Sequence, residues 1–583
     1  MPEPIWKGAP MDSRKKNRKP WMIAAVIIVI VVVIAVIAGA VLMKKYTPSK
    51  EQTDYTEYYN LTKENEMIVV VDNTRSATNG FYIDGHAYVD YDTVHDSINS
   101  RFFWDSTEQV LRYALPDNLI SVGADTNEYT LGKEKKQESY TICKVVDGKM
   151  YLAMDFVEAH TAVRYKHYES PERLVVSTEW GTLKYTKIKG NTEIRQKGGV
   201  KSPILSEVSK GTLVKVLDAG DNWSKVCTED GFIGYVKNKK LGKSQDVVTE
   251  STFEEPQYTH IKKNFQINMA WHQVTNQTAN SRVSQVLSTV SGVNVISPTW
   301  FYLNDDQGGI ASLASYDYVS YCHSKGIEVW GLVSNLENSE VDNAKVLNTT
   351  STRDNLENQI IAAAIQYDLD GINLDFESLK SKVGDGFIEF VRELSLKCAN
   401  NDLVLSIDNY TPSSYTNNLY QRAEQARFAD YVILMAYDEH YDGSDEGSVA
   451  SLSFVKDGVE QTLKDVPAEQ LILGIPFYTR VWALTQDETA ENGYTLSSEA
   501  VGMSEVDSRL ATNGVDTKWL DDCGQYYAEY QKDGVTYKIW IEDQNSIEEK
   551  LKVYQENNLA GVSFWKLGFE KSSIWDTVKK YVN

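Results

Sequence analysis

The C-terminal part of the chain, from about Tyr258 onward, alternates short apolar runs with helical stretches. Because strands that alternate with helices pair in parallel, this pattern predicts βα units around a parallel sheet. The expected strands are residues 267–272, 293–299, 328–334, 371–376, 403–407, 431–436, 471–476 and 561–565. Eight such units fit a (β/α)8 TIM barrel, in which chemistry gathers at the C-terminal ends of the strands.

The fourth run, D-G-I-N-L-D-F-E at residues 370–377, is polar on one face only. Side chains of a strand alternate, so Asn373, Asp375 and Glu377 project together and the apolar residues between them project the other way. The two carboxyl groups start roughly 6 to 7 Å apart, close enough for each to disfavour ionisation of the other. We therefore expect Glu377 to keep a proton near neutral pH and to donate it to a glycosidic oxygen.

This octapeptide resembles the D-x-x-D-x-D-x-E signature of family-18 glycoside hydrolases, and it matches at Asp370, Asp375 and Glu377. The resemblance implies that the N-acetyl group of the substrate attacks the anomeric carbon. Asp375 would stabilise the intermediate, and Glu377 would act first as acid and then as base. Asn373 stands where the family usually has aspartate, so it can hydrogen-bond Asp375 but cannot share a proton with it. A simpler acid limb of the pH profile is expected.

A subgroup of that family also reads I-N-x-D-F-E at this point, namely the spore-cortex-lytic and related bacterial cell-wall N-acetylglucosaminidases. The asparagine at position 373 is therefore interpreted as the mark of a subfamily and not of an inactive enzyme.

Three later runs end in residues that match further positions of the family. The sixth, M-A-Y-D, places Met435 and Tyr437 on one face and Asp438 at the rim. The resemblance implies that this tyrosine and aspartate hold the reacting N-acetyl group. The seventh offers Tyr478, and the eighth ends at Trp565, whose indole would lie beneath the reacting sugar. The predicted catalytic residues are Glu377, Asp375, Tyr437 and Asn373, and the predicted substrate-binding residues are Asp370, Met435, Asp438, Tyr478 and Trp565.

A longer, turn-rich stretch at about residues 483–545 lies where chitinase-like members of the family insert a small α+β domain that walls the groove. Trp482 is a further candidate for the groove. Asn335, Trp271 and His272 also end predicted strands, and for each a structural role is equally expected.

The N-terminal segment 21–43 is almost wholly Ile, Val and Ala and is long enough to cross a bilayer as a helix. Because cationic residues precede it, the tail 1–20 is expected in the cytoplasm and the rest of the chain outside the cell. These cations are Arg14, Lys15, Lys16, Arg18 and Lys19. A cleaved signal peptide with A-G-A at 38–40 is the alternative. The apolar region exceeds a typical signal-peptide core, which favours an uncleaved single-pass anchor in the cell membrane.

Between this segment and the barrel, a polar linker at 44–67 is followed by an internal repeat at 68–178. The motif Asp84, Gly85, Tyr88, Asp92 and Val94 recurs as Asp147, Gly148, Tyr151, Asp155 and Val157. The pattern resembles the α+β copper amine oxidase N-terminal-like domain. Nothing in it supplies copper ligands, so a spacer or a wall-contact domain is expected.

Residues 183–241 contain short alternating strands around turns and resemble a small all-β bacterial SH3-like barrel, with Trp223, Gly231 and Tyr235 among the matching positions. Such domains bind cell-wall peptide or pack beside a catalytic domain. An acidic linker at 242–257 then leads to the predicted barrel domain at 258–583.

Composition narrows the possible partners. A formal net charge of −23 disfavours nucleic acid. Five scattered cysteines show no close pairing and indicate buried thiols, and eight histidines show no ligand spacing, so neither a metal nor a cofactor is expected.

Together these features predict a membrane-anchored extracellular glycosidase that cleaves β-1,4 bonds of N-acetylglucosamine-containing polymers, with peptidoglycan as the preferred polysaccharide substrate. A chitinase acting on chitin oligosaccharides is an alternative. So is a catalytically silent glycan-binding protein, although such lectins usually lose the terminal glutamate that Glu377 retains. A surface scaffold that uses the N-terminal modules also stays open.

Overall fold

The computed structural model describes residues 19–490 and 493–582. Most of the predicted cytoplasmic tail, including the basic residues Arg14 to Arg18, lies outside the described residues. The chain divides into two units, Met1–Thr93 with Tyr151–Phe253 and Val94–Met150 with Glu254–Asn583. The stretch predicted as one repeat domain therefore contributes to both units.

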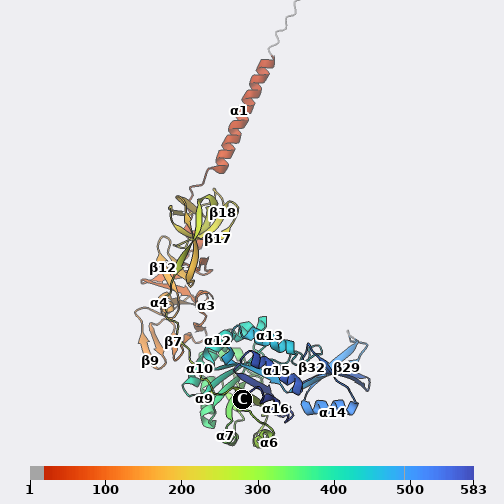
Figure 1. The fold of residues 1–583 in the computed structure, drawn as a ribbon. Coiled ribbons are helices and arrows are strands. Elements are labelled where there is room, and N and C mark those ends of the chain that lie inside the picture. Colours follow the sequence, from red (N-terminus) through yellow and green to blue (C-terminus); the bar gives the residue numbers. More distant parts are fainter. Residues whose placement is uncertain (1–18, 491–492, 583) are drawn as a thin grey trace, which may run out of the picture. The chain divides into compact units, whose positions relative to one another are not determined.

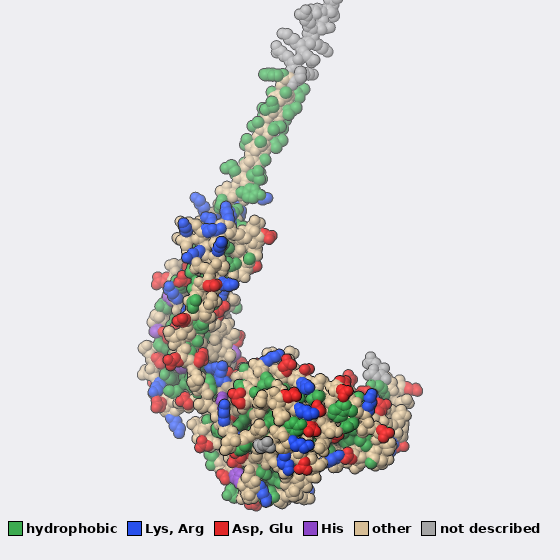
Figure 2. All heavy atoms as spheres, viewed as in Figure 1, with side chains coloured by type: hydrophobic (Ala, Val, Ile, Leu, Met, Phe, Trp, Pro, Cys, Tyr) green, Lys and Arg blue, Asp and Glu red, His purple; other side chains and the backbone are tan. Residues whose placement is uncertain are grey.

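Helix α1 (Lys19–Tyr46) is a single long helix (Figure 1), and between Trp21 and Met43 its sequence is apolar on every side. Its hydrophobic side chains are exposed, and Figure 2 shows them along the whole length of the helix that is in view. Among the described residues, the segment Trp21–Tyr46 is the one helix long and apolar enough to cross a membrane. A signal sequence near the N-terminus satisfies the same criteria of length and composition.

The internal repeat forms the same local structure twice, a hairpin followed by a short helix. The first copy is β3 (Gly80–Ile83), β4 (His86–Asp90) and α3 (Tyr91–Ser97), and the second is β10 (Cys143–Val146), β11 (Lys149–Ala153) and α4 (Met154–Ala159). Each hairpin turns at an Asp-Gly pair in which both residues have positive φ, 53° and 88° at Asp84 and Gly85 and 51° and 76° at Asp147 and Gly148. That conformation is the two-residue turn that Asp-Gly favours.

The first unit also contains a second, larger set of β-strands. A seven-stranded sheet has the order β16-β15-β19-β18-β17-β14-β20. Its strands are β14 (Gly181–Ile188), β15 (Thr192–Arg195), β16 (Ile204–Val208), β17 (Leu213–Ala219), β18 (Trp223–Thr228), β19 (Ile233–Lys237) and β20 (Leu241–Thr249). Ile188, Ile194, Val214 and Val236 belong to its small aliphatic core. The predicted second linker is thus partly strand, because β20 pairs with β14 along almost all of its length.

In the second unit, an antiparallel meander contacts the helices of the barrel. Its strands are β5 (Phe103–Asp105), β6 (Val110–Ala114), β7 (Leu119–Gly123), β8 (Glu128–Leu131) and β9 (Glu134–Gln137), paired in chain order. Arg112 forms an ion pair of 2.8 Å with Asp354, and the backbone N–H of Thr350 donates to Asp105 at 2.7 Å. This sheet lies between the two repeats in sequence and was not predicted as a separate element.

The predicted TIM barrel is confirmed. Its eight parallel strands are β21 (Ile267–His272), β22 (Val295–Leu303), β24 (Glu328–Ser334), β25 (Gly371–Asp375), β26 (Val404–Tyr410), β27 (Tyr431–Met435), β28 (Leu471–Pro476) and β34 (Gly561–Trp565). They pair in the order β21-β34-β28-β27-β26-β25-β24-β22, and pairing of β21 with β22 closes the barrel. Met269, Trp330, Ile433 and Ile472 fill the interior, so the barrel is a packed core.

Helices cover the outside of this barrel (Figure 1). They include α7 (Tyr316–Ser324), α9 (Thr350–Tyr367), α10 (Gly386–Ala399), α12 (Arg422–Phe428), α13 (Leu452–Thr462), α15 (Gln544–Glu556) and α16 (Ile574–Val578). Large apolar residues between strands and helices, such as Phe387, Phe390 and Trp575, form the main core.

The insertion between the last two barrel strands is a five-stranded sheet with one helix, of order β30-β29-β33-β32-β31. Its elements are β29 (Tyr478–Gln486), β30 (Tyr494–Gly502), α14 (Met503–Asn513), β31 (Lys518–Leu520), β32 (Gln525–Lys532) and β33 (Val535–Ile541). The first strand begins at Tyr478, two residues after β28 ends, so the insertion starts earlier than the predicted residue 483.

All five cysteines are free thiols, and four of them are buried.

Candidate active site

A cavity of about 150 Å³ opens at the C-terminal ends of the barrel strands. Its lining residues are Trp271, Asp375, Glu377, Asp408, Tyr410, Met435, Tyr437, Asp438 and Trp565. They come from β21, β25, β26, β27 and β34 and from the residues that follow those strands. Six of the nine predicted site residues therefore meet in one place.

Strand β25 presents the two expected carboxyl groups. Asp375 is its last residue, and Glu377 follows after the buried Phe376. Burial, with Glu377 nearby, raises the pKa of Asp375 well above the usual aspartate value. Burial also raises the pKa of Glu377, although a hydrogen bond with Tyr410 acts in the opposite direction. The carboxyl group of Glu377 therefore keeps its proton to higher pH than an exposed one, as an acid catalyst requires.

Asn335 fixes the backbone of Glu377. Its side-chain NH₂ donates to the Glu377 carbonyl oxygen at 2.9 Å, and its side-chain oxygen accepts from the Glu377 N–H at 2.8 Å. The hydroxyl of Tyr420 donates to the preceding carbonyl, of Phe376, at 2.7 Å. These bonds replace the strand ladder, which ends at Asp375, and hold the loop that carries the acid. Asn335 therefore positions Glu377.

Asn373 lies fully buried beneath the two acids on the same strand. Its side-chain oxygen accepts from the Trp271 indole at 2.8 Å and from the Ser297 hydroxyl at 2.9 Å. Its NH₂ donates to the Ser406 hydroxyl at 3.2 Å and to Asp408 at 2.8 Å. An amide offers two donors and two lone pairs, so this side chain is saturated. The expected hydrogen bond from Asn373 to Asp375 is therefore wrong.

Sequence reasoning missed Asp408 and Tyr410 because the fifth strand was expected to end at residue 407. The strand continues to Tyr410, and its residues S-I-D-N-Y put Ser406, Asp408 and Tyr410 on one face. This polar alternation has the same form as N-L-D-F-E in the fourth strand. Aspartate and asparagine are depleted in strands, which hid the extension.

Strand β27 and the start of the insertion supply the next group. The Tyr478 hydroxyl donates to Asp438 at 2.5 Å, and the rings of Tyr437 and Tyr478 meet edge to face at 6.3 Å. Burial, together with the charge of Asp408, keeps the pKa of Tyr437 well above its usual value, so its hydroxyl remains a donor. Tyr478 thus joins the site through Asp438.

Two tryptophans, from the first and the last strand of the barrel, meet at the cavity. Trp565 and Trp271 pack edge to face with ring centroids 6.0 Å apart. Trp271 is 1% exposed and holds Asn373, whereas Trp565 is only partly buried. Trp565 therefore offers an accessible aromatic surface of the kind that packs against a sugar ring.

Asp370 does not reach this cavity, which corrects its predicted role in substrate binding. It precedes β25 and so lies at the N-terminal end of the strand, opposite the cavity. Its carboxylate accepts from the Val329 N–H at 2.7 Å and contacts the His323 ring at 2.8 Å. The residue fastens the start of β24 to the strand beside it.

Two of the further candidates have structural roles. The ring nitrogen Nδ1 of His272 pairs with the Tyr318 hydroxyl at 2.8 Å, and burial lowers the pKa of His272 to about 4. Trp482 is 1% exposed and donates to the Gly447 carbonyl at 2.8 Å. Neither side chain lines the cavity.

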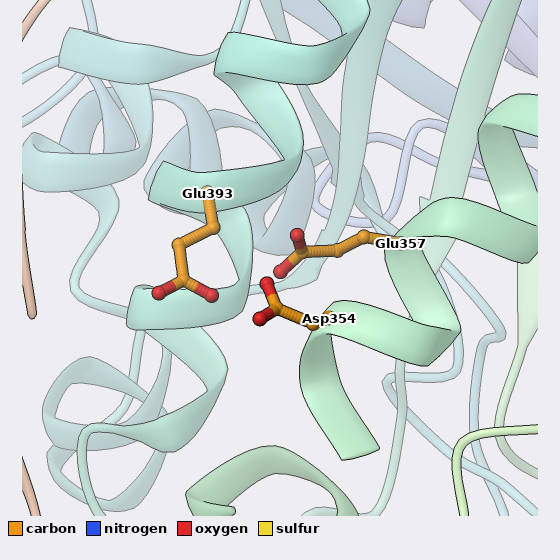
Figure 3. Close-up of side chains that lie close together, drawn as sticks. All are labelled: Asp354, Glu357 and Glu393. Carbon is orange, nitrogen blue, oxygen red and sulfur yellow. The ribbon is translucent and has the colours of Figure 1, made fainter. Parts of the chain in front are cut away.

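A second acidic cluster, Asp354, Glu357 and Glu393, lies between the outer helices α9 and α10 (Figure 3). Buried Arg353 binds Glu393 at 2.7 and 3.1 Å, and Lys397 lies 2.8 Å from Glu357. Burial opposes ionisation of Glu393, but the guanidinium of Arg353 prevails and lowers the pKa to about 2. Protein cations thus already compensate Asp354 and Glu393, whereas burial and the neighbouring Glu393 raise the pKa of Glu357 well above its usual value. The cluster is a buried carboxyl and ion-pair network of the scaffold.

The barrel and the acids at its rim define a glycoside hydrolase. The family model described as glycosyl hydrolases family 18 matches residues 232–570, more than half of the chain, and the chain belongs to this family. A bacterial SH3 domain model matches residues 190–241, so the seven-stranded sheet contains such a domain.

Two relatives from Bacillus subtilis (strain 168) each match a little under half of the chain. The uncharacterized glycosylase YvbX is 24% identical over 287 residues, which span 47% of this chain and 81% of YvbX. The cortical fragment-lytic enzyme is 24% identical over 266 residues, 44% of this chain and 60% of that enzyme. A solved C-terminal domain from Desulfitobacterium hafniense DCB-2 superimposes with a TM-score of 0.50 at 21% identity, covering 55% of this chain and all of that domain, which supports the fold alone.

Proposed function

We propose that this chain is a cell-surface N-acetylglucosaminidase that cleaves β-1,4 bonds of peptidoglycan by substrate-assisted, retaining catalysis. The observation that carries this proposal is the cavity in which Glu377, Asp375 and Tyr437 meet beside Trp565. An acid with a raised pKa, a second carboxyl two residues away and an accessible indole are what cleavage of a glycosidic bond needs.

In the first step, the protonated Glu377 gives its proton to the glycosidic oxygen as that oxygen leaves the anomeric carbon. The carbonyl oxygen of the substrate's own N-acetyl group forms the new bond to this carbon from the opposite face. Ionised Asp375 stabilises the positive charge that the N-acetyl nitrogen then shares, and Tyr437 donates a hydrogen bond to the same group. In the second step, Glu377 accepts a proton from water as the water displaces the N-acetyl oxygen.

The choice of peptidoglycan is supported by the accompanying elements. An SH3 domain precedes the barrel, and an apolar helix near the N-terminus is long enough for a membrane anchor. One relative is named a cortical fragment-lytic enzyme. A glycosidase held at the membrane would act on the polymer of its own cell wall.

The test is to incubate the full-length chain, purified in detergent, with peptidoglycan and separately with chitin oligomers, and to identify the new reducing ends by mass spectrometry. Muropeptides that end in reducing N-acetylglucosamine support the proposal. Products from chitin oligomers alone would indicate that the chain is a chitinase. Binding without products would indicate that it is a lectin. Glu377→Gln should abolish the products, while Glu460→Gln, on the exposed face of α13, should not.

We also propose that α1 is an uncleaved anchor with the barrel outside the cell. Its apolar stretch exceeds a typical signal-peptide core. The chain should remain in the membrane fraction after alkaline carbonate extraction, and external protease should digest the barrel in spheroplasts. A mature N-terminus just after Ala40 in a soluble fraction would show a signal peptide instead.

For the modules between the anchor and the barrel, we propose that the repeats act as a spacer and that the SH3 domain contacts cell-wall peptide. Co-sedimentation of the full-length Glu377→Gln chain with peptidoglycan tests the second role. Binding should weaken when an amidase has removed the stem peptides, and binding independent of these peptides would contradict it.

A further inference from the structure

The cavity contains more carboxyl groups than it can hold in ionised form. Asp375, Glu377, Asp408 and Asp438 all line it, and among the described residues none of its lining side chains is a lysine, arginine or histidine. Neighbouring carboxylates in a poorly solvated site disfavour one another's ionisation. The site must therefore retain protons, and their location decides which group can act as acid or as counter-charge.

Residue 373 cannot hold such a proton. The amide of Asn373 has no titratable group, and Trp271, Ser297, Ser406 and Asp408 already occupy its hydrogen-bonding positions. The aspartate that usually stands here in the family signature could share a proton with Asp375, but this chain needs another residue for that purpose.

Asp408 is level with Asp375 on the neighbouring strand. Strands β25 and β26 pair in parallel, with Asn373 opposite Ser406 and Leu374 opposite Ile407. The next position on each strand is Asp375 and Asp408, and adjacent strands lie about 4.8 Å apart. Their side chains both line the cavity. The register alone therefore places the two acids side by side.

The hydrogen bonds leave one oxygen of each acid available. Asp408 is 1% exposed, and its Oδ1 accepts from Asn373 at 2.8 Å. Its Oδ2 and the Oδ1 of Asp375 are buried without a hydrogen-bond partner among the residues that the structure describes. One proton between two such oxygens would satisfy both, whereas two ionised carboxylates would satisfy neither.

We propose that Asp408 carries the proton that it shares with Asp375, and so performs from β26 the task that the family signature assigns to residue 373. In the working state Asp408 is neutral and its O–H donates to the ionised Asp375. If the proton passes across, the O–H bond at Asp408 breaks, one forms at Asp375, and the negative charge moves to Asp408. This proposal rests on the proposed function, because it assigns a role in that same site.

The surrounding titratable groups favour one shared proton. Glu377 follows β25, Tyr410 ends β26, and Tyr437 and Asp438 follow β27. Tyr420 and the exposed Glu337 also interact with Asp375, and Arg480 lies 4.0 Å from Asp438. Burial, and to a lesser extent the charge of Glu377, raises the pKa of Asp408, although hydrogen bonding by Asn373 and Trp271 acts in the opposite direction. The expectation of a simpler acid limb is therefore replaced by that of a coupled pair of carboxyl groups.

The test uses the full-length chain in detergent and three variants, Asp408→Asn, Asn373→Asp and the double exchange. In the exchange the two facing residues swap places, so an acid and an amide still face each other. With a fluorogenic chitooligosaccharide, Asp408→Asn should lower kcat by about 10- to 100-fold and move the acid limb to higher pH, because Asp375 loses the shared proton that stabilises its ionised form. The double exchange should recover most of both changes.

A purely structural role for Asp408 would lower thermal stability but leave the pH profile unchanged, and that result overturns the proposal. A double exchange variant whose kcat and pH profile are no closer to the parent than those of Asp408→Asn also overturns it. Because these readouts require turnover, the infrared difference spectrum between parent and Asp408→Asn at neutral pH is recorded as well. Loss of a protonated carboxyl band supports the proposal, and loss of carboxylate bands overturns it, even for a protein that hydrolyses no probe.

Discussion

The side chain of Asn335 hydrogen-bonds both polar backbone groups of Glu377, accepting from its N–H at 2.8 Å and donating to its carbonyl oxygen at 2.9 Å. The acid thus follows the end of strand β25 but is positioned from strand β24. Burial of Asn335, which is 6% exposed, protects these bonds from competition by water.

Replacing Asn335 by Ala should therefore move the acid without removing it. Misplacement of about 1 Å can cost on the order of 100-fold in rate, so we expect kcat to fall by about 10- to 100-fold with little change in KM. Steady-state kinetics on a fluorogenic chitooligosaccharide measure this. Asn338→Ala, on the same loop, is the control, because the Asn338 side chain bonds the Asn304 carbonyl instead. A KM effect alone would contradict the positioning role.

Tyr410 should set the alkaline limb of the pH profile. Its hydrogen bond favours the ionised form of Glu377 and so lowers a pKa that burial raises. Glu377 must be protonated to act as acid, so Tyr410→Phe should let activity persist to higher pH than in the parent. The pH dependence of kcat/KM reports this for the free enzyme.

Tyr431→Phe is the matched control for that experiment. Tyr431 lies at the opposite end of the barrel, where its hydroxyl accepts from the Lys263 N–H at 3.0 Å. Its loss should leave both limbs in place. An alkaline limb that moves to lower pH in Tyr410→Phe would reverse the assigned sign.

Trp565 should contribute mainly to binding. Removal of its indole in Trp565→Ala should weaken oligosaccharide affinity by about tenfold, which corresponds to about 1.4 kcal/mol. Titration calorimetry in the Glu377→Gln background measures affinity without turnover. Trp565→Phe keeps an aromatic face and should retain most of it, and equal losses in the two variants would argue against stacking.

The buried pair of Arg353 and Glu393 should matter for stability and not for catalysis. Arg353→Met leaves a carboxylate buried and uncompensated, at a cost of about 3 to 5 kcal/mol in the free energy of unfolding at pH 7. Denaturant titration measures this, and Arg509→Met, at a more exposed pair with Glu499 and Glu505, should cost less than about 1 kcal/mol. Equal losses would refute the distinction.

The pair of Arg353 and Glu393 also determines how the free energy of unfolding changes with pH in the acid range. The pKa of Glu393 falls from 4.5 to about 2 in the folded protein, so its ionised form is stabilised by folding. That contribution is fully present above about pH 4.5 and is lost as the pH falls toward 2. In Arg353→Met this part of the acid dependence should be missing.

The sequence predicted the barrel because its strands are apolar runs between helices, a pattern that depends on the local chain alone. It also predicted the acids of β25, since a strand that is polar on one face reveals which side chains share that face. Asp408 was missed because a strand ending in S-I-D-N-Y contradicts local propensity, and only its pairing with β27 shows that it continues to Tyr410. Asp370 was misassigned because a motif does not show which end of the barrel each residue reaches.

The proposed mechanism requires that Glu377 acts as the acid in substrate-assisted, retaining hydrolysis. The most direct measurement is the anomeric configuration of the first products, followed by proton NMR as the parent and Glu377→Gln chains act on a soluble N-acetylglucosamine oligomer. We expect that the parent first releases the β-anomer and that Glu377→Gln releases no product at a comparable enzyme concentration. First release of the α-anomer, or turnover by Glu377→Gln at the parental rate, would contradict it.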